Sequence, residues 1–168
     1  NEYIGCDECG VGDYFGGITA AAVYVDEQTS LKLKKIGVVD SKKLDDKQIL
    51  NLAKKIKDVC LYNVTEFSPK YYNDYCILYK NQNVVKTLAH NLNIVKLQSQ
   101  YMRKHNGQRV TVVMDQYCDE KTYNKYLSDI QSIANLIVEK VNIFQTKAET
   151  KYLGVAAASI LAREAFIK

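Results

Sequence analysis

Two adjacent carboxylates are the residues best suited to chemistry in this chain. Asp7 and Glu8 stand at the end of a short apolar stretch and are followed at once by a segment with several glycines, residues 9–17. Carboxylate oxygens are the ligands that hard divalent cations such as Mg²⁺ prefer, and glycines let a backbone come close to a phosphate or a sugar. This order of residues predicts one half of a metal-dependent nuclease site.

Two later carboxylates are candidates for the other half. Asp115 ends the apolar run 110–114, and Glu149 comes shortly before the small-residue segment 153–163. A single acidic residue is most simply an exposed surface charge, and Glu149 could also stabilise the start of a helix electrostatically, by about 0.3–1 kcal/mol. Position favours the functional interpretation, because Asp115 lies at the edge of an expected core strand.

Other catalytic side chains are scarce. The chain has two histidines, His90 and His105, and one Cys-x-x-Cys pair, Cys6 and Cys9, with no second pair at a zinc-site spacing. A zinc or thiol catalyst is therefore disfavoured, and we interpret His90 as a structural residue.

The first acid pair sets a geometric condition. Successive side chains of a strand point to opposite faces, so Asp7 and Glu8 reach one site only if the strand ends or bends there. Gly10 and Gly12 make such a bend inexpensive.

The bulk properties are those of one globular domain. The chain has 168 residues, of which 47% are hydrophobic and 25% charged, and no apolar stretch is long enough for a membrane span. Its five cysteines are an odd number, which fits reduced thiols in an intracellular protein, so we expect a cytoplasmic protein with no membrane partner. Nothing in the sequence suggests an obligate interface, so we also expect a monomer. The net charge of +4 is modest, but nine lysines face three aspartates between positions 32 and 57, where a polyanion could bind.

The hydrophobic pattern predicts an α/β fold, a mixed sheet with helices packed against it. The two acid-bearing strands both end in a carboxylate, and ligand sites of open α/β sheets commonly lie beyond the carboxyl ends of strands. The expected strands are 3–8, 17–25, 31–39, 59–67, 109–115 and 136–144, and the expected helices are 45–57, a tyrosine-rich one after 68–69, 84–104 as the longest, 120–133 and 148–168.

Two further groups could touch a nucleic acid. Ser41, Lys42 and Lys43 offer a hydroxyl and two ammonium groups at a turn, which suits a phosphate, although a solvated turn is the simpler interpretation and the one we prefer for Lys43. The tyrosines of the segment 71–79 could stack on bases, but their helical spacing favours packing.

Taken together, five ordered segments of the chain resemble the type 2 ribonucleases H, and ribonuclease HIII in particular. The resemblance covers nearly the whole length, and residues 12–16 together with the absence of an arginine between Gly10 and Gly12 favour the HIII branch. Val11 and Gly17 depart from the usual motif without replacing an expected metal ligand. The matching segments are 4–16, 39–44, 81–83, 114–117, and 146–149 together with 155–163.

The resemblance implies an RNase H-like fold, a mixed central β-sheet flanked by α-helices, with residues 1–168 as one catalytic domain. The N-terminal substrate-binding domain and the C-terminal helices of ribonuclease HIII proteins are expected to lie outside it. It further implies that Mg²⁺ or Mn²⁺, as a two-metal site with Asp7 as the candidate bridging ligand, supports endonucleolytic cleavage of the RNA strand of RNA/DNA hybrids to 5′-phosphate and 3′-hydroxyl ends. The implied catalytic and metal-binding residues are Asp7, Glu8, Asp115 and Glu149, and the implied substrate-binding residues are Gly10, Val11, Gly12, Ser41, Lys42, Asn81 and Asn83.

Three alternatives remain open from the sequence. The nearest is ribonuclease HII-like incision at a single ribonucleotide in duplex DNA. A second is a module that binds the hybrid without cleaving it, and a third is a protein-interaction domain whose acids form a charged rim.

Overall fold

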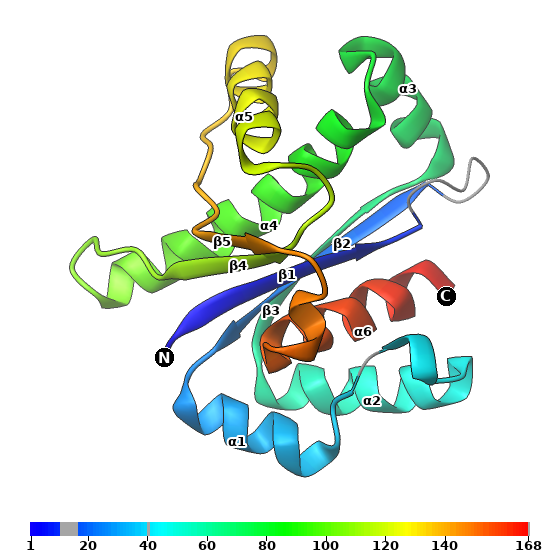
Figure 1. Ribbon diagram of the computed structural model, residues 1–168, viewed down its shortest axis with the longest axis vertical. Helices are drawn as coiled ribbons and strands as arrows, with labels where there is room; N and C mark the ends of the chain where they lie inside the picture. Colours follow the sequence, from blue (N-terminus) through cyan, green and yellow to red (C-terminus); the bar gives the residue numbers. More distant parts are fainter. Residues whose placement is uncertain (11–16, 40, 168) are drawn as a thin grey trace.

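The computed structural model describes residues 1–10, 17–39 and 41–167. These residues form a five-stranded sheet in the order β3-β2-β1-β4-β5, with helices on both of its faces (Figure 1). The expected α/β architecture with a mixed central sheet is confirmed. Its elements are β1 (Tyr3–Cys9), β2 (Ile18–Val25), α1 (Glu27–Ile36), the short 3₁₀ turn η1 (Ser41–Lys43), α2 (Asp46–Val59), β3 (Leu61–Phe67), α3 (Pro69–Tyr79), α4 (Gln82–Lys104), β4 (Thr111–Asp115), α5 (Glu120–Ala134), β5 (Ile143–Gln145), a second 3₁₀ turn η2 (Ala148–Thr150) and α6 (Leu153–Ile167).

The sheet is mixed because two kinds of pairing meet at β1. Strand β1 runs antiparallel to β2, which pairs antiparallel with β3, whereas β1 and β4 run parallel, as do β4 and β5. Side chains alternate between the faces, so Ile4 and Cys6 of β1 pack towards α4 while Ala21 and Val23 of β2 pack towards α1, α2 and α6. The central strands therefore have a hydrophobic core on each side.

Helix α6 lies directly on β1 because small residues face each other there. A Cβ atom on Gly5 would lie 2.5 Å from the backbone carbon of Gly154, which is closer than real contacts allow. Ala157 and Ala158 are fully buried in the same face, and the Thr19 hydroxyl donates a hydrogen bond to the carbonyl of Ala162. This close approach fixes α6, and the turn that precedes it, against the sheet.

The expected strand at 31–39 is wrong, since Glu27–Ile36 form helix α1. Asp26 caps this helix by accepting a hydrogen bond from the Thr29 amide, and Gly37 ends it with a φ of 81°. Apolar residues and lysines alternate at positions 31–34 and imitate a strand. Leu33 is buried in the core, and the capping residues decide the outcome.

Two other boundaries also differ from expectation. The strand expected at 136–144 is limited to Ile143–Gln145, because the amide side chain of Asn91 on α4 bonds the backbone of Ile137 and Glu139 in place of a neighbouring strand. The helix expected from residue 148 begins only at Leu153, after the η2 turn.

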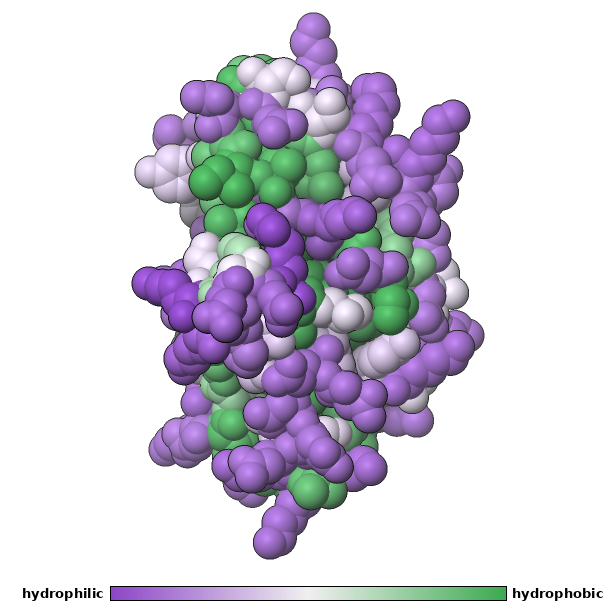
Figure 2. Space-filling model, turned by 90° about the vertical axis from the view of Figure 1, so that its left-hand side faces the viewer, coloured by the Kyte–Doolittle hydropathy of each residue, from purple (hydrophilic) through white to green (hydrophobic). Residues whose placement is uncertain are grey.

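One face of the molecule is mainly hydrophilic, with apolar side chains gathered towards the end where α5 lies (Figure 2). Ile133 of α5 and Ile137, which follows it, are largely exposed. None of the helices within 1–10, 17–39 and 41–167 has the length and apolar character needed to cross a membrane.

Candidate metal centre and active site

The sheet register brings the first two acids together. Parallel pairing of β1 with β4 runs up to the pair Cys6 and Met114, so Asp7 and Asp115 each follow one residue later on neighbouring strands. Facing residues of paired strands project from the same side of a sheet. Asp7 and Asp115 therefore meet at the carboxyl end of the two strands, as their positions in the sequence predicted.

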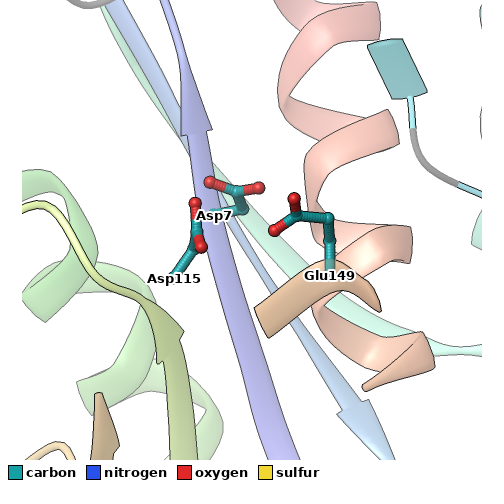
Figure 3. Close-up of side chains that lie close together, drawn as sticks. All are labelled: Asp7, Asp115 and Glu149. Atoms are coloured by element: carbon teal, nitrogen blue, oxygen red, sulfur yellow. The ribbon is translucent and has the colours of Figure 1, made fainter. Parts of the chain in front are cut away.

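Glu149 reaches the same point from the opposite direction, through the turn between β5 and α6. Lys147 adopts a left-handed conformation with a φ of 55°, and the Ala148 amide donates a 3.2 Å hydrogen bond to Oδ1 of Asp115. The carboxylates of Asp7, Asp115 and Glu149 each offer an oxygen, and these oxygens all lie within 4.8 Å of one another (Figure 3). Three acids from distant parts of the chain thus converge.

Their negative charges are poorly compensated by the protein. Burial, followed by the charges of Glu8 and Asp115, raises the pKa of Asp7 well above its ordinary value. Burial and the charge of Glu149 raise the pKa of Asp115 to about 6. Oε2 of Glu149 is buried without a hydrogen-bond partner among the described residues. Oxygen ligands, excess negative charge and an unsatisfied buried oxygen together fit a hard divalent cation.

Glu8 lies apart from these three acids. Strand β1 continues through Cys9, so the bend that would bring Glu8 beside Asp7 does not form within the strand, and the two side chains take opposite faces. Oε1 of Glu8 lies 2.7 Å from Nε2 of His90, and Oε2 lies 3.6 Å from Nζ of Lys86. Burial favours the neutral carboxyl, but these two partners outweigh it and lower the pKa of Glu8.

A cavity of about 440 Å³ opens over the acids. Ser41 and Lys42 line it, while their contact with a phosphate stays a prediction. Oγ of Ser41 lies 2.6 Å from Oγ of Ser159, and Arg163 donates to the Ser41 carbonyl while pairing with Asp46 at 3.1 Å. The full lining is Asp7, Glu8, Cys9, Ser41, Lys42, Asp115, Glu149, Ser159 and Arg163.

The other expected substrate residues are placed differently. Gly10 follows β1 with a φ of 92°, beside the ring of Phe166, while Val11 and Gly12 lie outside the described residues. Asn81 caps α4 by accepting a 2.8 Å hydrogen bond from the Asn83 amide. Both asparagines belong to the start of α4 and not to the lining of the cavity, and their contact with substrate stays a prediction.

Ser159 and Arg163 were not assigned a role from the sequence. They are four residues apart on α6 and therefore share one face of the helix. Lys86 and His90 on α4 have the same spacing. In each case, two polar residues four positions apart on an expected helix could have indicated a functional pair.

The mixed sheet, the flanking helices and the carboxylates near the carboxyl ends of β1 and β4 define an RNase H-like α/β fold. The family model described as Ribonuclease HII matches residues 4–167. The chain belongs to this family.

Individual relatives agree with this assignment. Ribonuclease HIII of Bacillus mycoides is 40% identical over 167 residues and that of Ureaplasma parvum 36% over 165, in each case 98% of this chain. Among solved structures, Bst-RNase HIII in complex with Mn²⁺ gives a TM-score of 0.87 at 35% identity over 99% of this chain and 52% of its own. RNase HII from the Archaeoglobus fulgidus PCNA complex gives 0.73 at 27% identity, over 98% and 71%. The chain spans about half the length of the curated relatives it matches.

Proposed function

We propose that this chain is the catalytic part of a type 2 ribonuclease H that hydrolyses the RNA strand of RNA/DNA hybrids with the help of divalent cations. The observation that carries the proposal is the convergence of Asp7, Asp115 and Glu149 to within 4.8 Å at the base of a cavity. The similarity to Bst-RNase HIII, which was solved in complex with Mn²⁺, supports Mg²⁺ or Mn²⁺ as the cation.

Each group of residues has a proposed task. Asp7, Asp115 and Glu149 would hold the cations, with Asp7 between the other two, and Glu8 would complete the set of four acids. When bound, the cations supply Lewis-acid activation of water and neutralise charge on the phosphate. The carboxylates themselves fix where the scissile phosphate can sit, and the products would carry 5′-phosphate and 3′-hydroxyl ends.

The opposite wall of the cavity would hold the nucleic-acid backbone. The Ser41 hydroxyl and the Lys42 ammonium group can both bind phosphate oxygens, and Arg163 holds the Ser41 backbone in place. Cys9 lines the cavity beside the acids, and the backbone from Cys9 to Gly10 would contact the ribose 2′-hydroxyl, the group that distinguishes RNA from DNA.

The test is cleavage of a uniformly paired RNA/DNA hybrid with labelled RNA, in Mg²⁺, in Mn²⁺ and in EDTA. We expect metal-dependent RNA cleavage that leaves 5′-phosphate ends, and loss of cleavage in the Asp115→Asn variant. Undiminished cleavage by Asp115→Asn, or cleavage in EDTA, would show that the acids are not the metal centre.

The second candidate is incision at a single ribonucleotide in duplex DNA. It is favoured by the match to the Ribonuclease HII family model and by the similarity to the Archaeoglobus RNase HII structure. A duplex with one embedded ribonucleotide, assayed beside the continuous hybrid, separates the two. Efficient incision of that duplex would support the second candidate.

We also propose that the chain works as a monomer in the cytoplasm. All five cysteines are free in the structure, which suits a reducing compartment. Light scattering after gel filtration tests the oligomeric state, and cell fractionation tests the location.

A further inference from the structure

A second polar cluster lies on the other face of β1, where α4 crosses the strand. Its centre is the Glu8 carboxylate, with His90 Nε2 at 2.7 Å and Lys86 Nζ at 3.6 Å. The Lys86 ammonium group lies 4.3 Å from the centre of the Tyr117 ring, and that ring is stacked near His90 at 6.1 Å. The Thr87 hydroxyl forms a hydrogen bond with the hydroxyl of Tyr117. Tyr117 thus lies beside both partners of the Glu8 carboxylate and is itself held by Thr87.

The cluster is an expensive way to fill a protein interior. The His90 side chain is fully buried, and its Nδ1 has no hydrogen-bond partner in the part of the chain that the structure describes. An unsatisfied buried polar atom costs about 1–3 kcal/mol, and buried ion pairs add little or no net stability compared with apolar packing. An apolar ring at position 90 would fill the same space without an unpaired Nδ1, but it would leave the Glu8 carboxylate without its 2.7 Å partner. The contact with Glu8, and not packing alone, therefore accounts for the histidine.

The hydrogen bond of His90 has a defined direction. An ionised carboxylate can only accept, so Nε2 of His90 donates to Glu8, and Nδ1 is the atom without a partner among the described residues. His90 and Lys86 are four residues apart on α4 and approach different oxygens of the same carboxylate. Together they restrict both the position and the rotation of the Glu8 carboxylate.

Glu8 also lines the cavity that contains the three converging acids. We propose that His90, assisted by Lys86, is a positioning residue that fixes the Glu8 carboxylate at the edge of the metal-binding cavity. This inference rests on the proposed function, because it gives Glu8 a task only if the cavity binds cations. It assigns a role to His90, which the sequence alone led us to interpret as structural.

The experiment is a Mn²⁺ titration of the whole chain, followed by calorimetry and by the electron paramagnetic resonance signal of free Mn²⁺. His90→Phe keeps an aromatic ring but removes the donor, and His90→Gln places an amide Nε2 donor near the original one. We expect His90→Phe to weaken Mn²⁺ affinity roughly 10–100-fold, the range usual for groups that orient ligands from outside the metal shell. His90→Gln should restore most of the affinity.

A double-mutant cycle with Glu8→Ala shows whether His90 acts through Glu8. In the Glu8→Ala background, His90→Phe should change Mn²⁺ affinity by less than about 2-fold, because the group that it positions is gone. Unchanged affinity in His90→Phe, an equal loss in both backgrounds, or failure of a folded His90→Gln to rescue would each overturn the inference.

Two controls keep the result clear. If His90→Phe does not fold, Lys86→Met takes its place in the cycle, and it must weaken affinity only when Glu8 is present. Absence of Mn²⁺ binding by the unaltered chain, or undiminished binding by Asp115→Asn, would refute the proposed function itself. Binding that depends on Asp115 but not on His90 or Lys86 would refute only the positioning role.

Discussion

The neighbouring carboxylates Asp7 and Glu8 lie on the two faces of β1 in opposite electrostatic surroundings. On the α6 face, Asp7 meets Asp115 and Glu149, and both aspartates have raised pKa values because they are buried among like charges. On the α4 face, the Glu8 side chain is 13% exposed, and His90 and Lys86 lower its pKa against the effect of burial. Asp7 and Glu8 are adjacent in β1 and point to opposite faces of the sheet. Asp7 therefore belongs to a cluster of unbalanced negative charge, whereas the charge of Glu8 is balanced by neighbouring side chains.

The difference indicates what each face is for. A fold can hold unbalanced carboxylates close together only at a cost in stability, and this cost is recovered when a cation binds. The balanced carboxylate needs no cation to remain ionised. The comparison therefore predicts that ligands acting on the cations come chiefly from the α6 face, with Glu8 supplying a fixed contact from the other side.

The largest effect should come from Asp7→Asn. Loss of the central acid of the cluster should lower metal-dependent cleavage of the hybrid by about 10²–10⁴-fold, equivalent to several kcal/mol of lost charge stabilisation. Glu8→Gln should weaken Mn²⁺ affinity less than Asp7→Asn does. The control is Asp58→Asn, which changes an exposed acid on α2 and should alter neither cleavage nor Mn²⁺ affinity. Equal losses of Mn²⁺ affinity in the Asp7 and Glu8 variants would remove the distinction between the two faces.

The next effect concerns the close contact that carries Glu149 to the site. Gly5→Ala would place a Cβ atom 2.5 Å from the backbone of Gly154, and overpacking of this kind typically costs about 1–3 kcal/mol. We expect thermal denaturation to show a melting temperature lower by about 2–4 °C for each kcal/mol. Mn²⁺ affinity should fall as well, because α6 and the turn before it must move.

Gly37→Asn is the matched control for this variant. Gly37 follows the end of α1, and apart from its chain neighbours no atom of the described residues lies within 4 Å of an added Cβ there; asparagine tolerates its positive φ. A melting temperature for Gly5→Ala equal to that of Gly37→Asn would show that β1 and α6 can separate without cost.

A smaller effect tests the unbalanced charge directly. Folding raises the pKa of Asp115 to about 6, compared with about 3.9 in an unfolded chain, so the folded state binds the proton more tightly. The stability linked to this proton is fully present below about pH 3.9 and is lost as the pH rises through about 6. Without metal, Asp115→Asn should therefore be more stable than the unaltered chain above pH 6, by about 1 kcal/mol after solvent screening of this half-buried group.

Denaturant titrations at several pH values, in EDTA, measure this difference. It should shrink as the pH falls below 6 and disappear near pH 4. Added Mn²⁺ should reverse the order at pH 7.5, because only the intact cluster gains stability from the cation. A destabilised Asp115→Asn at neutral pH without metal would contradict the charge imbalance on the α6 face.

The sequence was sufficient to predict the α/β architecture and to predict that Asp7 and Asp115 lie close together. Both acids follow apolar stretches, and ligand sites of open α/β sheets commonly lie at the carboxyl ends of strands, which predicted their meeting. The parallel pairing of β1 with β4 that brings them together is known only from the structure. Glu149 was also named from the sequence, through the resemblance to the ribonucleases H, but the means by which it reaches the site was not: its position depends on the η2 turn and its left-handed Lys147. Local pattern carries little information on such turns.

The sequence could not predict that His90 and Lys86 are the partners of Glu8, for a related reason. His90 and Glu8 are 82 positions apart and meet only because α4 crosses β1 on the face opposite Asp7. The alternation of side chains along a strand predicted that β1 must bend for Asp7 and Glu8 to share a site. It could not predict that the strand continues without this bend. Packing of α4 and α6 on opposite faces determines which acid has compensating charges.

The smallest expected effect comes from a variant that lowers the stability of the elements packed on the α6 face without changing the charges of the three acids. Asp26→Ala removes the N-cap of α1, which packs on this face through Leu33 but lies outside the cavity lining. Loss of a cap costs about 0.5–1 kcal/mol, so the melting temperature should fall by a few degrees at most. Mn²⁺ affinity and its dependence on pH should stay as in the unaltered chain, because the acids are held by β1, β4 and η2 and not by α1. A cap variant that weakened Mn²⁺ binding as much as Gly5→Ala would mean that overall stability, and not the local contact of β1 with α6, controls the geometry of the three acids.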